Sequence, residues 1–144
     1  MILRAPDPQE APALTDLVMR SKASWGYDAA FMEACRDVLT VRPESWEVPQ
    51  VAVDGDLVGY VELHPSDCTL NHLFIDPKAQ HRGVGSALLS WAVDRARAEG
   101  LPHLTLAADP NAEGFYHRHG WTITGSTPSE VANVRPLAVM TLTL

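Results

Sequence analysis

The chain has 144 residues, of which 46% are hydrophobic and 20% charged, and its formal net charge is −7. This length and composition suit a globular protein with a hydrophobic core, which we expect to form one domain over residues 1–144. The acidic balance argues against nucleic-acid partners, since phosphate binding requires a basic surface.

The sequence also argues against a membrane or disulfide-bonded protein. No apolar run approaches the roughly 18 residues of a membrane span, and residues 1–7 lack the basic start and long apolar run of a signal peptide. Cys35 and Cys68 have neither CxxC spacing nor the density of a disulfide scaffold. We therefore expect a cytoplasmic protein with no membrane partner, no metal site and no disulfide.

Capping residues mark two helices in the first part of the chain. A short strand is expected over residues 2–5, and Asp7-Pro8-Gln9-Glu10 then combines an N-cap, a first-turn proline and a capping-box glutamate. A helix should follow to about Arg20. Asp28 can cap a second helix that runs to about Leu39.

The rest of the chain alternates strands and helices. Pro43 and Pro49 bracket an irregular link, and Asp54-Gly55 between two apolar runs predicts a hairpin that returns to about Leu63. The elements expected after it are a strand over residues 69–75, a helix over 83–99, a strand over 104–107, a helix over 109–120, and strands over 121–124 and 137–142. This order predicts an α/β (α+β) fold with a mixed sheet flanked by about four helices.

A glycine-containing turn leads from the expected strand at residues 69–75 into the long helix. The missing side chains of Gly83 and Gly85 let an anion approach the backbone, and the unpaired amides at the start of a helix attract phosphate. A pyrophosphate would fit there, although a plain structural turn is an equal alternative for an isolated motif. Neither a Walker loop nor a dinucleotide GxGxxG pattern is met.

Two motifs in this order resemble the GNAT N-acetyltransferase superfamily. They are Gln80-x-x-Gly83-x-Gly85, and Asn111 with Phe115-Tyr116 ahead of Gly120-Trp121. The resemblance covers nearly the whole chain. It implies a largely antiparallel sheet that splays at a central bulge, acetyl-CoA as co-substrate, and frequent pairing into a homodimer.

The resemblance also implies the residues that hold the cofactor. Amides at the bulge, near Phe74 and Ile75, would hold the pantetheine arm and the thioester carbonyl, and Asn111 matches an amide that contacts the cofactor. The pyrophosphate would be held by the amides of Gln80, His81, Arg82, Gly83, Val84, Gly85 and Ser86. The side chains of Lys78, His81 and Arg82 could lend positive charge to the phosphates, with ordinary loop charges as an equal alternative.

Tyr116 matches the family's tyrosine beside the departing sulfur. A tyrosine with a pKa of about 10 stays protonated at neutral pH and can donate a hydrogen bond to a thiolate. Complete transfer of its proton to a thiol that titrates near about 8.5 is uphill by roughly 2 kcal/mol. We therefore expect Tyr116 mainly to stabilise the leaving sulfur, while packing beneath the sheet is the structural alternative.

The attacking amine must be neutral, so some group must accept its proton. The candidates are Glu62 and His64 on one expected strand and His72 beside the expected bulge. The sequence does not choose among them, and water could also carry the proton. A bulge reverses the facing of the residues beyond it, so strand alternation does not tell whether His72 points into the cleft.

The acceptor wall is expected between the first two helices, where Trp25 and Tyr27 lie. These aromatic side chains could contact a small amine through cation–π attraction, or simply pack the helices onto the sheet. The residues up to His72 hold five basic and twelve acidic side chains, which favours a cationic acceptor. Arg135 and Pro136 are further candidates for the acceptor side.

Together these features predict an acyltransferase that moves an acetyl group from acetyl-CoA to the primary amine of a small molecule, by direct attack in a ternary complex. No activated cysteine is apparent, which disfavours a covalent acyl-enzyme. The alternatives are a non-catalytic acyl-CoA-binding or regulatory module on the same fold, a generic nucleotide-binding domain, and an acetyltransferase for protein N termini or lysines.

Overall fold

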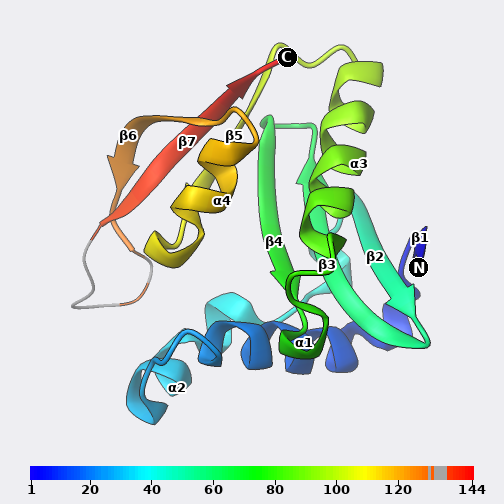
Figure 1. Ribbon diagram of the computed structural model, residues 1–144, viewed down its shortest axis with the longest axis vertical. Helices are drawn as coiled ribbons and strands as arrows, with labels where there is room; N and C mark the ends of the chain where they lie inside the picture. Colours follow the sequence, from blue (N-terminus) through cyan, green and yellow to red (C-terminus); the bar gives the residue numbers. More distant parts are fainter. Residues whose placement is uncertain (130, 132–135) are drawn as a thin grey trace.

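The computed structural model describes residues 1–129, 131 and 136–144 (Figure 1). The strands in the described part are β1 (Ile2–Arg4), β2 (Val48–Asp54), β3 (Asp56–His64), β4 (Thr69–Ile75), β5 (His103–Ala108), β6 (Thr122–Thr127) and β7 (Leu137–Thr143). The α-helices are α1 (Ala11–Ala23), α2 (Ala29–Leu39), α3 (Val84–Ala98) and α4 (Glu113–Arg118). Short 3-10 turns are η1 (Pro8–Glu10), η2 (Pro43–Ser45), η3 (Pro77–Ala79) and η4 (Pro110–Ala112).

The sheet is mixed and splits near its centre. Its strand order is β1-β2-β3-β4-β5-β7-β6, and every neighbouring pair except β4–β5 is antiparallel. The parallel β4–β5 pair has a single register position, Thr69 opposite Thr105, after which the two strands diverge (Figure 1). The predicted fold class is confirmed, including the splayed sheet.

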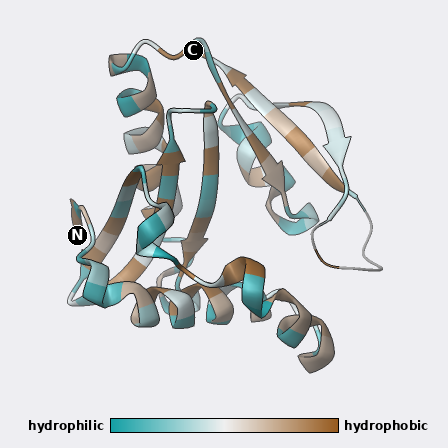
Figure 2. Ribbon diagram, turned by 180° about the vertical axis from the view of Figure 1, so that it is seen from behind, coloured by the Kyte–Doolittle hydropathy of each residue, from teal (hydrophilic) through white to brown (hydrophobic). Residues whose placement is uncertain are grey.

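Two hydrophobic clusters cover the two faces of the β1–β4 half. Side chains of neighbouring strand residues point to opposite faces. Val61 and Leu63 accordingly belong to the cluster that contains α3, whereas Tyr60 belongs to the cluster with α1 and α2. Figure 2 shows hydrophobic segments along the central strands, while β6 is pale to hydrophilic. By the same alternation, Glu62 and His64 lie on the α1–α2 face.

A bulge interrupts β4 beside the split. Between the pairs Glu62–Asn71 and Tyr60–Phe74, β3 advances by two residues and β4 by three, so β4 contains an extra residue at His72–Leu73. His72 has φ +57°, in the left-handed region that costs a residue other than glycine about 1–2 kcal/mol. The bulge therefore comes just before Phe74 and Ile75, the positions where the family resemblance implied it.

Several element boundaries differ from the expectation. Helix α1 continues to Ala23, beyond Arg20. Pro49 lies inside β2, within the segment expected to be irregular, and β1 pairs with β2 only from Val51 onward, so no neighbour on that side needs an N–H from Pro49. The helix expected from Asp109 begins as a 3-10 turn, which leaves only Glu113–Arg118 as α4.

Candidate active site

The start of α3 offers backbone amides to an anion. Gly83 is the N-cap with φ +79°, no side chain caps the helix, and no acidic residue lies in its first turn. The amide of Ala87 donates to the Gly83 carbonyl at 3.0 Å, so the three amides before it, from Val84 to Ser86, precede the helical hydrogen-bond ladder. Such amides and the positive end of the helix dipole favour a bound phosphate.

A cavity of about 550 Å³ opens onto these amides. Its walls include most of the predicted phosphate turn, namely Gln80, His81, Gly83, Val84, Gly85 and Ser86. A Cβ atom at Gly85 would lie 3.4 Å from the Phe115 ring, so a larger side chain would crowd the cavity wall. The turn and cavity therefore fit a diphosphate.

Arg82 is turned away from this cavity. Its guanidinium donates to the Lys78 carbonyl at 2.7 Å and lies 3.7 Å from a carboxylate oxygen of Asp54. The cavity instead includes Arg118, from the last turn of α4, and the neighbouring His119 lies 3.1 Å from the Ser86 hydroxyl. The sequence motifs did not indicate a role for Arg118 or His119 here, because their proximity to this cavity depends on how α4 packs beside α3.

The backbone of β4 presents an amide toward the split in the sheet. The amide of Asp76 donates to the Val58 carbonyl at 2.8 Å, so Asp76 and its alternate neighbour Phe74 direct their backbone groups to β3. Ile75, between them, directs its amide and carbonyl to the other side. The Gln80 side-chain amide approaches that carbonyl at 3.4 Å.

A second cavity, of about 680 Å³, adjoins the first one and is lined partly by residues of α1 and α2. The residues that line both cavities are Trp25, Leu73, Phe74, Asn111, Ala112 and Tyr116. A ligand that enters along α3 and passes Tyr116 would therefore reach the second cavity.

Tyr116 is almost fully buried where the two cavities meet. Only 7% of the residue is exposed, and its ring packs against Phe115 and Trp121 at centroid distances of 5.3 and 5.7 Å. Burial raises the pKa of the Tyr116 hydroxyl well above its ordinary value, because the phenolate would be poorly solvated there. The hydroxyl therefore remains a proton donor at physiological pH.

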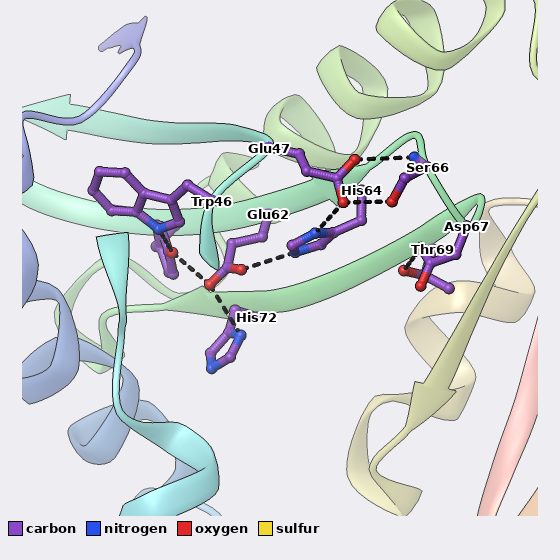
Figure 3. A network of polar contacts seen from close by, with 9 residues as sticks. Trp46, Glu47, Glu62, His64, Ser66, Asp67, Thr69 and His72 are labelled. Atoms are coloured by element: carbon purple, nitrogen blue, oxygen red, sulfur yellow. Dashed lines mark hydrogen bonds and ion pairs between the residues drawn. The ribbon is translucent and has the colours of Figure 1, made fainter. Parts of the chain in front are cut away.

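Glu62 is the centre of a polar network on the α1–α2 face (Figure 3). Its Oε2 accepts a hydrogen bond from the Tyr60 hydroxyl at 2.6 Å and lies 3.1 Å from Nδ1 of His72, and its Oε1 lies 3.0 Å from Nε2 of His64. Glu62 is only 5% exposed, so these partners replace its water shell. All three predicted base candidates thus lie in one network.

The network extends from Glu62 toward both sides. Nδ1 of His64 lies 3.0 Å from Glu47, and the Tyr60 hydroxyl accepts a hydrogen bond from Trp46 at 2.6 Å. Burial lowers the pKa of His64, but its hydrogen bonds with Glu62 and Glu47 outweigh burial and leave that pKa raised. Burial and the neighbouring carboxylate of Glu62 raise the pKa of Tyr60 far above its ordinary value.

Among the three base candidates, only His72 lines one of the two cavities described above. It forms part of the wall of the 680 Å³ cavity, whereas Glu62 and His64 stand behind it. His72 lies at the bulge and has a left-handed backbone. Strand alternation fails across a bulge, so the sequence alone did not predict that His72 faces this cavity.

The predicted acceptor wall, Trp25 and Tyr27, contacts residues that border the expected cofactor cavity. Trp25 lines both cavities, and the Tyr27 hydroxyl donates to Asp109 at 2.8 Å. The Asn111 side-chain amide donates to the Tyr27 hydroxyl at 3.2 Å and to Asp109 at 2.9 Å. Burial raises the pKa of the Asp109 carboxyl, but the hydrogen bonds from Lys22 and Asn111 and the positive charge of Lys22 together outweigh burial and leave that pKa lowered. The sequence did not indicate Lys22 or Asp109.

The remaining predicted site residues and groups are placed as follows. Pro136 is exposed and does not line the acceptor cavity, while Arg135 lies outside the described residues.

Within the described ranges, no His, Cys, Asp and Glu side chains form a group that could hold a metal ion. No helix in the described part is long and apolar enough to cross a membrane.

The sheet splits at a bulge, with uncapped helix amides that favour an anion on one side and a cavity beside them, as binding of a phosphate-containing ligand would require. Comparison with known families agrees, because residues 15–144 match the model of the acetyltransferase (GNAT) domain. The chain therefore belongs to the GNAT family and is an acyltransferase, as its glycine and tyrosine motifs predicted.

Individual relatives support the same assignment. Peptidyl-lysine N-acetyltransferase YiaC of Escherichia coli (strain K12) is 29% identical over 132 residues, which cover 85% of this chain and 84% of that protein. A GCN5-related N-acetyltransferase from Rhodopseudomonas palustris superposes with a TM-score of 0.86 at 21% identity, covering 99% of this chain and 95% of that one. The PaiA N-acetyltransferase from Thermoplasma acidophilum, in complex with coenzyme A, superposes with a TM-score of 0.75 at 16% identity, covering 99% and 98%.

Proposed function

We propose that the protein transfers an acetyl group from acetyl-CoA to the primary amine of a small molecule, by direct attack in a ternary complex. The observation that carries this proposal is the pair of neighbouring cavities, which share Asn111 and Tyr116 in their walls. One begins at the uncapped amides of α3, and the other contains His72.

Acetyl-CoA, when bound, supplies the activated thioester. The amides from Val84 to Ser86 would hold its diphosphate, and the turned-out amide of Ile75 would hold the arm that leads into the split. An amide aimed at a carbonyl oxygen stabilises the negative charge that develops there during attack. Asn111 and Trp25 would border the passage between the two cavities.

His72 accepts the proton of the attacking amine in this proposal. Its ring lines the acceptor cavity and lies 3.1 Å from Glu62, whose negative charge stabilises the protonated imidazole. Glu62 and His64 are positioning residues, because neither lines the cavity. Tyr60 and His64 hold the two oxygens of Glu62 from the far side.

Tyr116 donates a hydrogen bond to the leaving sulfur without giving up its proton. The raised pKa of its buried hydroxyl makes complete transfer to a thiolate still less favourable than it would be for an ordinary tyrosine. The proton that the departing thiolate needs therefore comes ultimately from the amine.

The size of the acceptor cavity favours a small molecule. Its volume of about 680 Å³ lies within the roughly 300–1,000 Å³ range of small-molecule pockets. The second candidate acceptor is a lysine side chain of a protein, which is favoured by the similarity to a relative named a peptidyl-lysine N-acetyltransferase.

Release of the coenzyme A thiol tests both candidates. The protein would be incubated with acetyl-CoA and a panel of small primary amines, lysine-containing peptides and peptides with a free N terminus. We expect at least one small amine to give a higher kcat/KM than any peptide. A preference for lysine peptides would favour the second candidate, and no release with any acceptor would contradict the proposed transfer.

A further inference from the structure

The acceptor cavity contains an ammonium group inside an aromatic cage. Nζ of Lys22 lies 5.1 Å from the ring centroid of Tyr27, 5.5 Å from that of Trp25 and 6.0 Å from that of Phe31. The same Nζ lies 2.5 Å from a carboxylate oxygen of Asp109. Aromatic faces within about 6 Å and a carboxylate are the groups that bind ammonium ligands.

The cage is built into the protein rather than exposed on its surface. The side chains of Lys22 and Asp109 are only 13% and 10% exposed, and both line the acceptor cavity. Asp109 is held in place by Tyr27 and Asn111, and it caps η4 by accepting from the Asn111 amide. The carboxylate would therefore keep its position if the ammonium of Lys22 were removed.

Lys22 and Asp109 form an ion pair in the described part of the cavity wall. Lys22 and Asp109 are the only Lys, Arg, Asp or Glu side chains among the described residues that line it. Most other lining side chains are apolar, including Phe31, Val38 and Leu39. Because Asp109 is already paired with Lys22, a cationic group in this cavity would meet the Lys22 ammonium without a free carboxylate among the described lining residues, and like charges at short range repel.

We propose that Lys22 is the built-in occupant of a cation-binding site in the acceptor cavity, and that it excludes acceptors which carry a second cationic group. The inference rests on the proposed function and narrows its substrate class to amines on a neutral, largely apolar body. It opposes the cationic acceptor that the overall acidic charge suggested, because the Asp109 carboxylate is already paired with the Lys22 ammonium. Lys22 thus acts as a specificity-determining residue.

Acceptor selectivity provides the first test. Wild-type protein and Lys22→Ala would be compared with a series of α,ω-diamines of three to five carbons and the monoamines of equal chain length, at a pH where the second amine is charged. We expect the wild type to prefer the monoamines. In Lys22→Ala, the kcat/KM ratio of diamine to monoamine should rise at least about tenfold, the factor that about 1.4 kcal/mol of cation attraction produces.

Binding of tetramethylammonium provides a test that does not depend on catalysis, because this cation has no N–H and is not acetylated. In calorimetry, Lys22→Ala should bind it at least about tenfold more tightly than the wild type. Adding Asp109→Asn, which retains a capping side chain, should abolish the gain. Arg36→Ala is the matched control, since it removes an exposed positive charge on α2 that pairs with Glu33.

The outcomes separate the cage from the proposed function. A folded Lys22→Ala protein that binds tetramethylammonium no better than the wild type would overturn the inference, as would wild-type protein that uses diamines as well as monoamines. If thermal melting shows that Lys22→Ala does not fold, Lys22→Ser, which also vacates the cage, must show the same gain. If no amine supports acetyl transfer, the proposed function fails, and the tetramethylammonium titration alone decides whether the cage exists.

Discussion

His72 illustrates how one backbone irregularity can define a site. The extra residue in β4 gives His72 a left-handed backbone, and the side chain meets both Glu62 and the acceptor cavity. Strained backbone of this kind is common at functional sites. The sequence indicated His72 together with Glu62 and His64 but did not choose among them, because strand alternation fails across a bulge whose position no local motif marks.

Substitutions in this pair should affect catalysis in different ways. His72→Gln should lower kcat by roughly 10²-fold, since the amine loses its proton acceptor. Glu62→Gln should have a smaller effect on kcat and should move the acidic limb of the pH–rate profile to lower pH, because the carboxylate no longer stabilises the protonated imidazole. Steady-state kinetics across pH would measure both effects.

Glu47→Gln is the matched control for Glu62→Gln. Glu47 contacts His64 and Ser66 at the outer end of the network. The Glu47→Gln variant should leave the acidic limb of the pH–rate profile unchanged. An equal shift in both variants would mean that the limb reports general charge around the network, and our assignment of Glu62 would be wrong.

The hydroxyl of Tyr116 should matter for turnover and not for cofactor affinity. Tyr116→Phe should lower kcat by roughly 10²-fold, as expected when one preorganised donor is removed from the reacting centre. The dissociation constant of coenzyme A, measured by calorimetry, should change by less than about threefold, because the ring and its packing remain. Unchanged turnover would leave Tyr116 a packing residue only.

At the scale of elements, local capping and turn signals were sufficient to predict most helices and strands. Asp28 caps α2 by accepting from the Phe31 amide at 2.8 Å, and Asp54-Gly55 joins β2 to β3. The boundaries that were wrong depend on tertiary contacts. Pro49 can lie in β2 because the neighbouring strand β1 pairs with β2 only from Val51 onward. Helix α1 extends to Ala23, and its last turn places Lys22 in the wall of the acceptor cavity.

Helix α3 can approach the sheet closely only because residue 59 is a glycine. A Cβ atom on Gly59 would lie 2.8 Å from Leu88 and 2.9 Å from Val84, both side chains of α3. Gly59→Ala should therefore destabilise the protein by about 1–3 kcal/mol, the usual cost of overpacking, and should weaken coenzyme A binding by displacing the start of α3. Denaturant unfolding and calorimetry would measure the two effects.

Gly125→Ala on β6 is the control, since an added Cβ there has no neighbour within 4 Å. Its unfolding free energy should change by no more than about 0.5 kcal/mol. If both alanine variants were equally stable, close packing of α3 on Gly59 would not be what positions the phosphate turn.

The 3-10 turn η1, which ends at Glu10, should contribute stability that depends on pH. The hydrogen bond with Arg4 and the Asp7 backbone amide lower the pKa of Glu10 from 4.5 to about 2. A carboxyl with a lowered pKa stabilises the folded state above its unfolded pKa and loses that effect as pH falls through the folded one. The melting temperature of Glu10→Ala should thus fall below that of the wild type at pH 7, and the difference should shrink between about pH 4.5 and pH 2.

Glu33→Ala on α2 serves as the comparison, because Glu33 is an exposed partner of Arg36 with a side chain 73% accessible. It should show little difference in melting temperature at any pH. A pH-independent effect of Glu10→Ala would contradict the role of its charge.

At the scale of the whole molecule, the family motifs predicted the fold, which is confirmed, and they marked the glycine turn and Tyr116, whose roles stay predictions. The acceptor cage was not predicted. Lys22 and Asp109 are 87 positions apart in the sequence. They meet only in the folded protein, where the end of α1 and the turn after β5 both line the acceptor cavity. No local spacing signals a contact of this kind, so its discovery required the three-dimensional structure.

The central claim is that the two cavities form one path from the start of α3, past Tyr116, to His72. A crystal structure of the protein with coenzyme A at saturating concentration tests it most directly. We predict a diphosphate on the amides from Val84 to Ser86 and a sulfur atom beside the Tyr116 hydroxyl. A coenzyme bound elsewhere, or with its thiol directed away from the cavity that holds His72, would contradict the claim.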